Sequence, residues 1–341
     1  MQGFDFLKKG DKIGVCAPSM GCGEEGYYKK RCDNAVLNFN KKGHEIVFTE
    51  HCFGSLWARS TTAKKRAEEF EQLFFDENIK GIISMAGGEF ELEILPFLNF
   101  EKLKEAKNKF FQGFSDNTCI SFLLATLCEK TSVYSSNFCN FGMEKWHKSL
   151  KDNYNLLCGK KVEQKSYKKY EIESNRKEEG NELNGYNLTE KTSPKILSGQ
   201  DEVNVKGVLI GGCLDVLSHI CGTKFDKVKE FCNKHNEEGI VWFFESCDLN
   251  VCEQFRCIWK LQQAGWFDNA KAILIGRPLN KEPVFDYDYE QANFDNFKDS
   301  KIPVVINLDI GHTSPNWTII NGGKVNFKCN KNKASISFDL I

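Results

Sequence analysis

The sequence predicts an α/β protein built on parallel sheets, and three observations support this class. Short apolar runs of strand length alternate with longer stretches in which apolar residues recur every three or four positions. Glycine, proline, serine and asparagine gather where the apolar runs end, as they do in turns between strands and helices. The chain has 341 residues, of which 41% are hydrophobic and 27% are charged. This length and composition suit a sizeable core and, most simply, two domains.

The first part of the chain alternates strands with helices. In the stretch 61–75, apolar residues recur at helical spacing and threonines are available to cap its start. Such alternation favours a parallel sheet covered by helices on both faces, and ligands bind beyond the carboxyl ends of its strands. Gly87, Gly88 and Ser115 lie at such ends. The expected strands are residues 11–19, 44–48, 80–85 and 110–114, and the expected helices are 29–40, 61–75, 91–98 and 117–127.

The composition changes between residues 160 and 204, where Lys, Glu, Asn, Ser and Gly dominate and apolar periodicity fades. We interpret this stretch as a solvated connection between two domains and hypothesise that it acts as a lid. The predicted division is therefore 1–160, 161–204 and 205–341. In the last part we expect strands at 205–212, 239–244, 271–278 and 302–307, helices at 214–220 and 252–265, and a β-hairpin at 324–341.

The charge balance excludes some classes of partner. The chain carries 46 basic and 47 acidic side chains, so we expect neither a nucleic-acid nor an anionic-membrane partner. No apolar run approaches the roughly 18 residues that a membrane-spanning helix needs. The first ten residues also lack the apolar core of a signal peptide. We therefore expect a cytoplasmic protein.

Cysteine usage is high, at 15 residues, but the pattern fits no known ligand spacing. The number is odd and there is no C-x-x-C pair. Cys247, Cys252 and Cys257 recur at five-residue steps, which suits neither a zinc knuckle nor an iron–sulfur motif. We expect reduced thiols, mostly small buried hydrophobic side chains, and no bound metal.

Ser115 is the candidate nucleophile. It follows Gly113 and Phe114 and lies between an apolar strand and a helical stretch. A strand–turn–helix places such a side chain at a helix N-terminus, where free N–H groups favour developing negative charge. The surrounding sequence is not G-x-S-x-G, and a serine at this place can equally be a helix N-cap.

Gly88 and Asp116 are candidate donors to an oxyanion. The pair Gly87 and Gly88 follows a strand, where a backbone N–H is available, and the N–H of Asp116 follows the serine. Together they would form an oxyanion hole, although a glycine pair is also an ordinary turn. No G-x-G-x-x-G follows the first strand, so the dinucleotide-binding fingerprint is missing.

Glu245 and His312 are the candidate acid and base. Glu245 ends the apolar run 240–244, and a carboxylate at the end of a buried strand is costly unless it is paired. Asp248 is a nearby competitor. Of the six histidines, His312 is the best base because it lies in a turn after a strand. We expect His44, His51, His147 and His235 at the surface and a structural role for His219 within a helix. The order Ser, Glu, His supplies a nucleophile, an orienting carboxylate and a general base.

Taken in order, these motifs resemble the serine peptidase family of LD-carboxypeptidases and microcin C immunity proteins. The resemblance covers nearly the whole chain and is closer to the immunity branch, through the long connection and the run Gly211 to Asp215. The segments that carry it are 10–19, 66–67, 75–76, 84–88, 95–98, 113–118, 209–217, 222–223, 244–245, 264–265, 276–278 and 311–313.

The resemblance implies a fold and an activity. The family's nucleophile, acid and base would fall on Ser115, Glu245 and His312. The fold would be an N-terminal Rossmann-like domain and a C-terminal swivelling α/β domain with the active site between them, commonly in a homodimer. Members cleave an amide next to a free carboxylate, in an L,D-linked muropeptide or in a peptidyl- or aminoacyl-adenylate mimic.

One feature of the immunity branch is missing. Its better-known members use tryptophans in the inter-domain segment to stack on adenine, but residues 160–204 contain no Trp. Tyr167, Tyr170 and Tyr186 are the aromatic side chains that could replace them. Arg277 is a candidate for binding the substrate carboxylate through two hydrogen bonds, or else a structural ion-pair residue.

We therefore expect a serine carboxypeptidase or amidase that needs no metal or organic cofactor. Its substrate would be a small peptide or an aminoacyl-nucleotide. One alternative is a catalytically idle ligand-binding relative with the same fold, but the intact Ser, Glu and His count against it. Another is a nucleotide-binding Rossmann module, which the missing glycine fingerprint disfavours.

Overall fold

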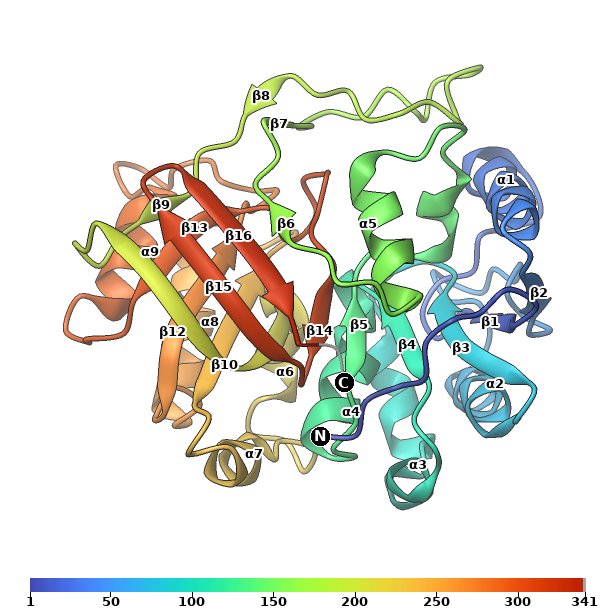
Figure 1. Cartoon of the computed structure of the whole chain (residues 1–341), viewed down its shortest axis with the longest axis horizontal. Coiled ribbons are helices and arrows are strands. Elements are labelled where there is room, and N and C mark those ends of the chain that lie inside the picture. The colour runs from blue at the N-terminus through green and yellow to red at the C-terminus, as the bar shows by residue number, and fades with distance from the viewer. Residues whose placement is uncertain (340–341) are drawn as a thin grey trace. The chain divides into compact units, whose positions relative to one another are not determined.

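A computed structural model of the chain describes residues 1–339 and divides into two compact units. Unit 1 comprises Met1–Lys160 and Glu173–Asn187, and unit 2 comprises Lys161–Ile172 and the chain from Leu188 onward. The connection expected at 161–204 is thus shared between the two units. Each unit is built on its own sheet, and the elements of both are labelled in Figure 1.

Unit 1 contains a parallel sheet in which the strands follow the order β5-β4-β3-β1-β2. In Figure 1, α1 and α5 cover one face of this sheet and α2, α3 and α4 cover the other. This confirms the predicted parallel-sheet α/β class. The strands are β1 Lys12–Cys16, β2 Glu45–Phe48, β3 Ile79–Ser84, β4 Phe110–Gly113 and β5 Ser132–Tyr134. The α-helices are α1 Gly26–Lys41, α2 Ala63–Phe75, α3 Phe100–Glu105, α4 Thr118–Thr126 and α5 Lys148–Leu157, and the 3₁₀ helices are η1 Glu91–Phe97, η2 Ser115–Asn117 and η3 Phe138–Gly142.

The core of unit 1 is rich in phenylalanine. Phe70 of α2 packs edge-on against Phe111 of β4, with ring centroids 5.5 Å apart. On the other face, Phe39 of α1 lies 5.1 Å from Phe141. Thr62 occupies the N-cap of α2, as the sequence predicted, but its side chain makes no capping hydrogen bond.

Unit 2 contains a mixed sheet with the strand order β6-β16-β15-β10-β11-β12-β13-β9. Neighbours from β10 to β13 are parallel, and the other pairs are antiparallel. The predicted C-terminal hairpin is β15 and β16, and residues 340–341 of that prediction lie outside the described residues. The strands of this sheet are β6 Gln164–Lys165, β9 Lys195–Ile196, β10 Glu202–Cys213, β11 Ile240–Glu245, β12 Ala270–Gly276, β13 Val304–Leu308, β15 Lys324–Asn330 and β16 Lys333–Phe338, and the short strand β14 Ile319–Asn321 lies outside it. The helices are α6 Leu214–Ile220, α7 Val228–Lys234, α8 Val251–Gln263 and α9 Tyr289–Phe297, and a separate ribbon pairs β7 Lys169–Tyr170 with β8 Glu190–Lys191.

The parallel strands of unit 2 are buried along their length. Every residue of β11 is buried, which explains its continuous apolar run before Glu245. Helix α8 begins with a capping box between Asn250 and Glu253 and buries Val251, Ile258 and Leu261. Sequence periodicity therefore located this helix correctly.

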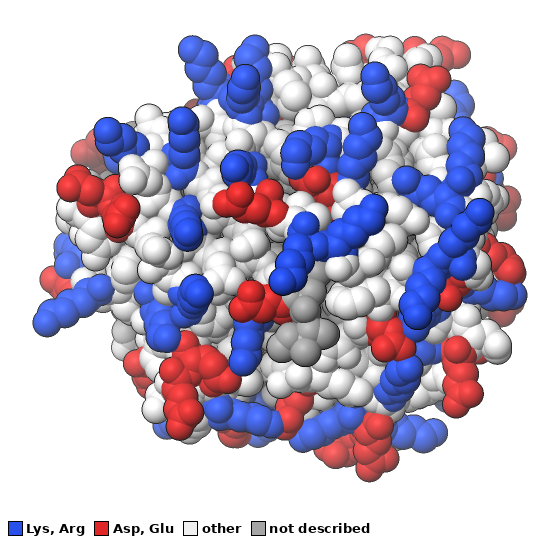
Figure 2. Space-filling model, in the orientation of Figure 1, with Lys and Arg blue, Asp and Glu red and all other residues white. Residues whose placement is uncertain are grey.

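Charged side chains of both signs are interspersed over the face shown in Figure 2, in keeping with the balanced composition. Across residues 1–339, no helix combines the length and the apolar character needed to cross a membrane.

Candidate active site

Ser115 lies in a strained turn of unit 1. Strand β4 ends at Gly113, and Ser115 is the first residue of η2, which leads into α4. Its φ angle is +68°, a left-handed backbone conformation that residues other than glycine rarely adopt. The serine N–H donates to the hydroxyl of Tyr134 at 3.1 Å, and the serine carbonyl accepts from the hydroxyl of Thr118 at 2.7 Å. Phe114 rather than Ser115 occupies the N-cap of η2, so the N-cap alternative does not describe this turn.

The glycine loop after β3 lies directly against this serine. A Cβ added to Gly87 would lie 3.1 Å from the Cβ of Ser115 and 3.2 Å from its Oγ. Gly88 has a φ of +152°, and a Cβ there would lie 2.2 Å from the Oγ of Ser19. Only glycine fits at position 88 without displacing the neighbouring loop. The amide of Asp116 is at the start of η2, where helix N–H groups lack intrahelical acceptors.

The residues around the serine turn include two buried carboxyl groups, those of Asp116 and Glu91, that the sequence did not indicate. Asp116 is 3% exposed, and its Oδ2 accepts from the hydroxyl of Ser19 and, at 2.8 Å, from the amide of Glu91. Burial raises the pKa of Asp116. Burial, together with the charge of Asp116, raises the pKa of Glu91 well above its usual range. These contacts tie the loop 19–20, the loop before η1 and η2 into one network.

Glu245 and His312 form a hydrogen-bonded pair in unit 2. Glu245 is the last residue of β11 and is 1% exposed. Its Oε2 lies 2.7 Å from Nδ1 of His312. Gly311 has a φ of +107°, and a Cβ there would lie 2.6 Å from Oε2 of Glu245. Glycine therefore lets the turn that carries His312 press against the carboxylate.

The environment of His312 favours its protonated form. Burial alone lowers the pKa of the imidazole, but the charge of Glu245, the hydrogen bond with Cys247 and the hydrogen bond that Glu245 accepts outweigh it. The pKa of His312 therefore lies well above its usual value. The competitor Asp248 instead donates its backbone amide to Oδ1 of Asp215 at 2.9 Å.

Arg277 supports the same turn through a buried ion pair. Its Nη1 donates to Oδ1 of Asp309 at 2.7 Å, and its Nε donates to Oγ1 of Thr313 at 3.0 Å. The ring of Tyr170 packs 4.5 Å from the guanidinium carbon. Arg277 thus has the contacts of a structural ion-pair residue, and its binding of a substrate carboxylate stays a prediction.

The side chain of Asp215 organises the loop after β11, and sequence reasoning missed this role. Its two carboxylate oxygens accept from the amides of Cys247, Asp248 and Leu249 at 3.1, 2.9 and 3.3 Å. Oδ2 also accepts from Sγ of Cys213 at 3.2 Å. The available sequence signal was the motif Gly211 to Asp215. It indicated the family resemblance but not the hydrogen bonds that Asp215 accepts.

The expectation of surface positions for His44 and His235 was wrong, because they are only 2% and 6% exposed. Nε2 of His44 hydrogen-bonds the hydroxyl of Tyr154 at 2.9 Å, and the ring of His235 packs against Phe231. All 15 cysteines are free thiols.

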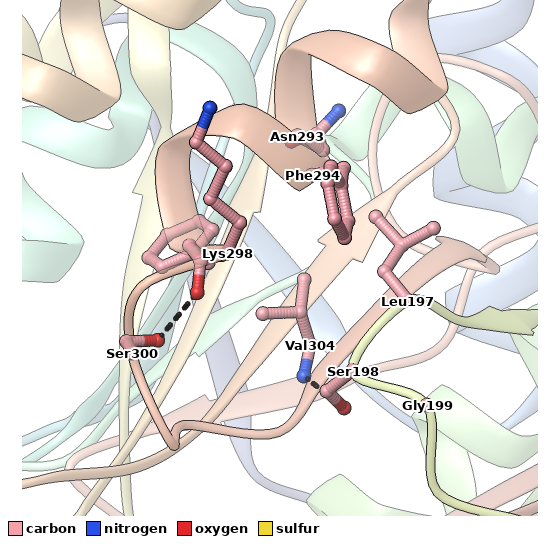
Figure 3. A pocket seen from close by; sticks show the side chains of 9 residues that line it. Leu197, Ser198, Gly199, Asn293, Phe294, Lys298, Ser300 and Val304 are labelled. Carbon is pink, nitrogen blue, oxygen red and sulfur yellow. Dashed lines mark hydrogen bonds between the residues drawn. The ribbon is translucent and has the colours of Figure 1, made fainter.

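A pocket of about 220 Å³ in unit 2 contains none of the candidate residues. In Figure 3, Phe294 of α9 and Lys298, which directly follows that helix, line it with Leu197 and Val304. The side chain of Ser198, which also lines the pocket, accepts a hydrogen bond from the amide of Val304 at 3.3 Å. The chemistry of the Glu245–His312 pair is therefore separate from this pocket.

Two family profiles match the chain. Residues 13–135 match the profile described as the LD-carboxypeptidase N-terminal domain, and residues 206–327 match the LD-carboxypeptidase C-terminal domain. Ser115 lies in the first matched range, and Glu245 and His312 lie in the second.

Individual proteins match over nearly their whole length. The putative carboxypeptidase YocD of Bacillus subtilis is 26% identical over 322 residues, covering 93% of both chains. The microcin C7 self-immunity protein MccF of Escherichia coli is 28% identical, covering 97% of this chain and 94% of that protein. The solved structure of MccF in complex with aspartyl sulfamoyl adenosine is similar in fold, with a TM-score of 0.81 at 23% identity and 99% coverage of both chains.

Proposed function

Because this chain belongs to the LD-carboxypeptidase family, we propose that it is a serine peptidase that cleaves an amide bond next to a free carboxylate. The observation that carries the proposal is the buried pair of Glu245 and His312, joined at 2.7 Å. A carboxylate that holds one imidazole nitrogen leaves the other for proton transfer, as in hydrolytic triads. The strained Ser115 supplies the nucleophile.

In the proposed reaction, Oγ of Ser115 attacks the substrate carbonyl carbon. His312 takes the serine proton and gives it to the leaving amine, while Glu245 fixes the imidazole and stabilises its charged form. The amides of Gly88 and Asp116 donate hydrogen bonds to the oxyanion. Water then hydrolyses the acyl-enzyme. The nucleophile and the base belong to different units, so the proposal requires both units in one active protein.

The substrate class follows from the relatives and from this chain's aromatic side chains. Curated relatives are named as putative carboxypeptidases, and MccF has been solved with aspartyl sulfamoyl adenosine. In this chain, Tyr170 packs on Arg277, and Tyr186 packs on His147 and Arg176. Because these rings already have partners and the segment has no tryptophan, we place a small peptide such as a muropeptide tetrapeptide first and an aminoacyl-nucleotide second.

The proposal is tested by incubating the protein with a muropeptide tetrapeptide and, separately, with aspartyl sulfamoyl adenosine. Release of the terminal amino acid is followed by mass spectrometry, and Ser115→Ala is the matched control. Cleavage of either compound by the wild type alone supports the proposal. Binding of a compound without any cleavage would instead favour the idle ligand-binding relative.

We also propose that the enzyme is a cytoplasmic homodimer. The support is the family resemblance, together with the balanced charge of the chain. Light scattering coupled to size-exclusion chromatography should give about twice the chain mass of 39.0 kDa. A single-chain mass over a wide concentration range would contradict the dimer.

A further inference from the structure

Three potential metal ligands converge at the ends of two neighbouring strands of unit 2. Cys213 and Glu245 are the last residues of β10 and β11 and are partners in the parallel register. His312 reaches the same place from the turn after β13. One ligand atom from each of the three side chains lies within 4.8 Å of the others.

We propose that Cys213, Glu245 and His312 form an inhibitory binding site for Zn²⁺ or a cation of similar softness. A thiol, an imidazole and a carboxylate are the groups that zinc prefers, whereas calcium and magnesium prefer oxygen alone. Zinc bonds of about 2.0–2.3 Å set tetrahedral ligand atoms roughly 3.3–3.7 Å apart. Shifts of about 1 Å would bring the three groups into that geometry.

A supporting carboxylate strengthens the site. The thiol of Cys247 hydrogen-bonds His312 but does not belong to the group of three ligand atoms, so the fourth ligand of the cation would be water. Asp215 accepts from the thiol of Cys213 at 3.2 Å and from the amide of Cys247 at 3.1 Å. Carboxylates that orient ligating side chains in this way commonly strengthen metal binding.

The charges around the cluster favour a cation. Glu245 is 1% exposed and Cys213 is 2% exposed, and the carboxylate of Asp215 faces the same thiol. Zinc binding would release the protons of the Cys213 thiol and of His312 to solvent, because only a thiolate and a neutral imidazole bind the metal. A divalent cation would interact with both carboxylates and with a thiolate in surroundings that screen charges weakly.

The functional consequence rests on the proposed function. A cation bound to Glu245 and to Nδ1 of His312 would replace the hydrogen bond that orients the base. Zinc would then act as an inhibitor rather than as a cofactor.

Direct binding is the first test and does not depend on activity. Isothermal titration of the whole reduced protein with Zn²⁺ should show a site that Cys213→Ser weakens by at least about 10-fold. Co²⁺ in place of zinc should give a thiolate-to-metal charge-transfer band that Cys213→Ser diminishes. Cys213→Ala, which adds no hydroxyl, guards against a folding defect specific to serine.

Two matched variants identify the site. Cys252→Ser removes a partly buried thiol outside the cluster. His51→Ala removes one ligand from a second potential metal-binding group, which Glu50, His51 and Glu69 form in unit 1. Both variants should bind zinc as the wild type does. Unchanged binding by both Cys213 variants, or loss of binding in His51→Ala, would overturn the proposal.

Activity is the second test. Micromolar Zn²⁺ should inhibit cleavage, EDTA should restore it, and Cys213→Ser should need at least about 10-fold more zinc for the same inhibition. Zinc binding at Cys213 without inhibition of an active enzyme would refute the inhibitory role. Zinc binding at Cys213 in a protein that cleaves neither substrate would contradict the proposed function while leaving the metal site standing.

Discussion

The candidate residues of unit 1 and those of unit 2 are held in place by different physical means. In unit 1, unusual backbone conformations position the candidate residues: Ser115 has a φ of +68° and Gly88 has a φ of +152°. In unit 2, ion pairs position them: Glu245 pairs with His312, and Arg277 pairs with Asp309, which precedes the turn that carries His312. The difference indicates that the first group depends on steric fit and the second on charge. Changes of charge that break these ion pairs should therefore affect the candidate residues of unit 2 most.

The largest effect is expected from removing the nucleophile or the base. Ser115→Ala should lower kcat by roughly 10⁴-fold or more, because only binding and oxyanion stabilisation remain. His312→Ala should cost a similar factor, and the double variant little more, since the two groups act as one unit. Steady-state kinetics with the better substrate measures this, and calorimetry should show that binding persists.

The exposed Ser55→Ala is the control and should keep full activity. If Ser115→Ala retains most of the activity, the serine mechanism is wrong, and loss of wild-type activity in EDTA would count equally against it.

Glu245→Gln should change the pH dependence of catalysis, and this tests whether charge positions His312. The limb of kcat/KM that rises with pH reports the base of the free enzyme, and it should lie above pH 6.5 in the wild type because the pKa of His312 is raised. The neutral amide removes the attraction that raises this pKa, so the limb should move to lower pH. The plateau should fall by about 10²- to 10⁴-fold, because the imidazole loses its orienting carboxylate.

The same pair should contribute to stability with a defined sign. A raised folded-state pKa means that the stabilisation is complete below the unfolded pKa of His312 and is lost as pH rises through the folded value. Urea unfolding of Glu245→Gln should lack that decline. A pH profile identical to that of the wild type would remove Glu245 from its assigned role.

Arg277→Met should destabilise unit 2 by about 3–5 kcal/mol, because Asp309 would stay buried without its cation. Denaturant titration measures the change. The double variant Arg277→Met with Asp309→Asn should recover much of the loss, because no buried charge then stands alone. If the single variant is as stable as the wild type, the ion pair does not hold the His312 turn.

The smallest expected effect is a gain in the stability of unit 1. Glu91→Gln should raise the free energy of unfolding at pH 7 by about 1–2 kcal/mol, because burial and Asp116 oppose a charged Glu91. Since the folded pKa of this acid is raised, the wild type should lose stability as pH rises above the unfolded pKa, and the variant should lose less. The exposed Glu105→Gln is the control. A destabilised Glu91→Gln would show that this carboxyl group is needed as such.

The sequence predicted most of the sheet strands because their apolar runs are continuous. It missed α5, although Leu150, Leu156 and Leu157 are buried, because Asp152 and Asn153 share the buried face and obscure the periodicity. Asn153 is buried because its side-chain amide donates to Gln112 at 3.0 Å, a contact between residues 41 positions apart. Pairings of this kind depend on the folded chain and leave no local pattern.

The residues of the candidate site also fall into those that the sequence could identify and those that it could not. Glu245 and His312 could be paired beforehand because a buried carboxylate needs a partner and few histidines were suitable. Ser19, Glu91 and Asp215 could not be found, because each acts on a backbone amide or side chain far along the chain. The left-handed conformation of Ser115 was also invisible, since serine has no preference for it.

The division of the chain between the units also constrains its synthesis. Glu173–Asn187 belongs to unit 1, although the chain on both sides of it belongs to unit 2. The guanidinium of Arg31, in a side chain that is only 2% exposed, donates to the carbonyl of Glu182 at 2.7 Å. A ribosome must therefore release residue 187 before unit 1 can complete its contacts, by which time part of unit 2 has already emerged. No single proteolytic cut can separate this protein into its two units.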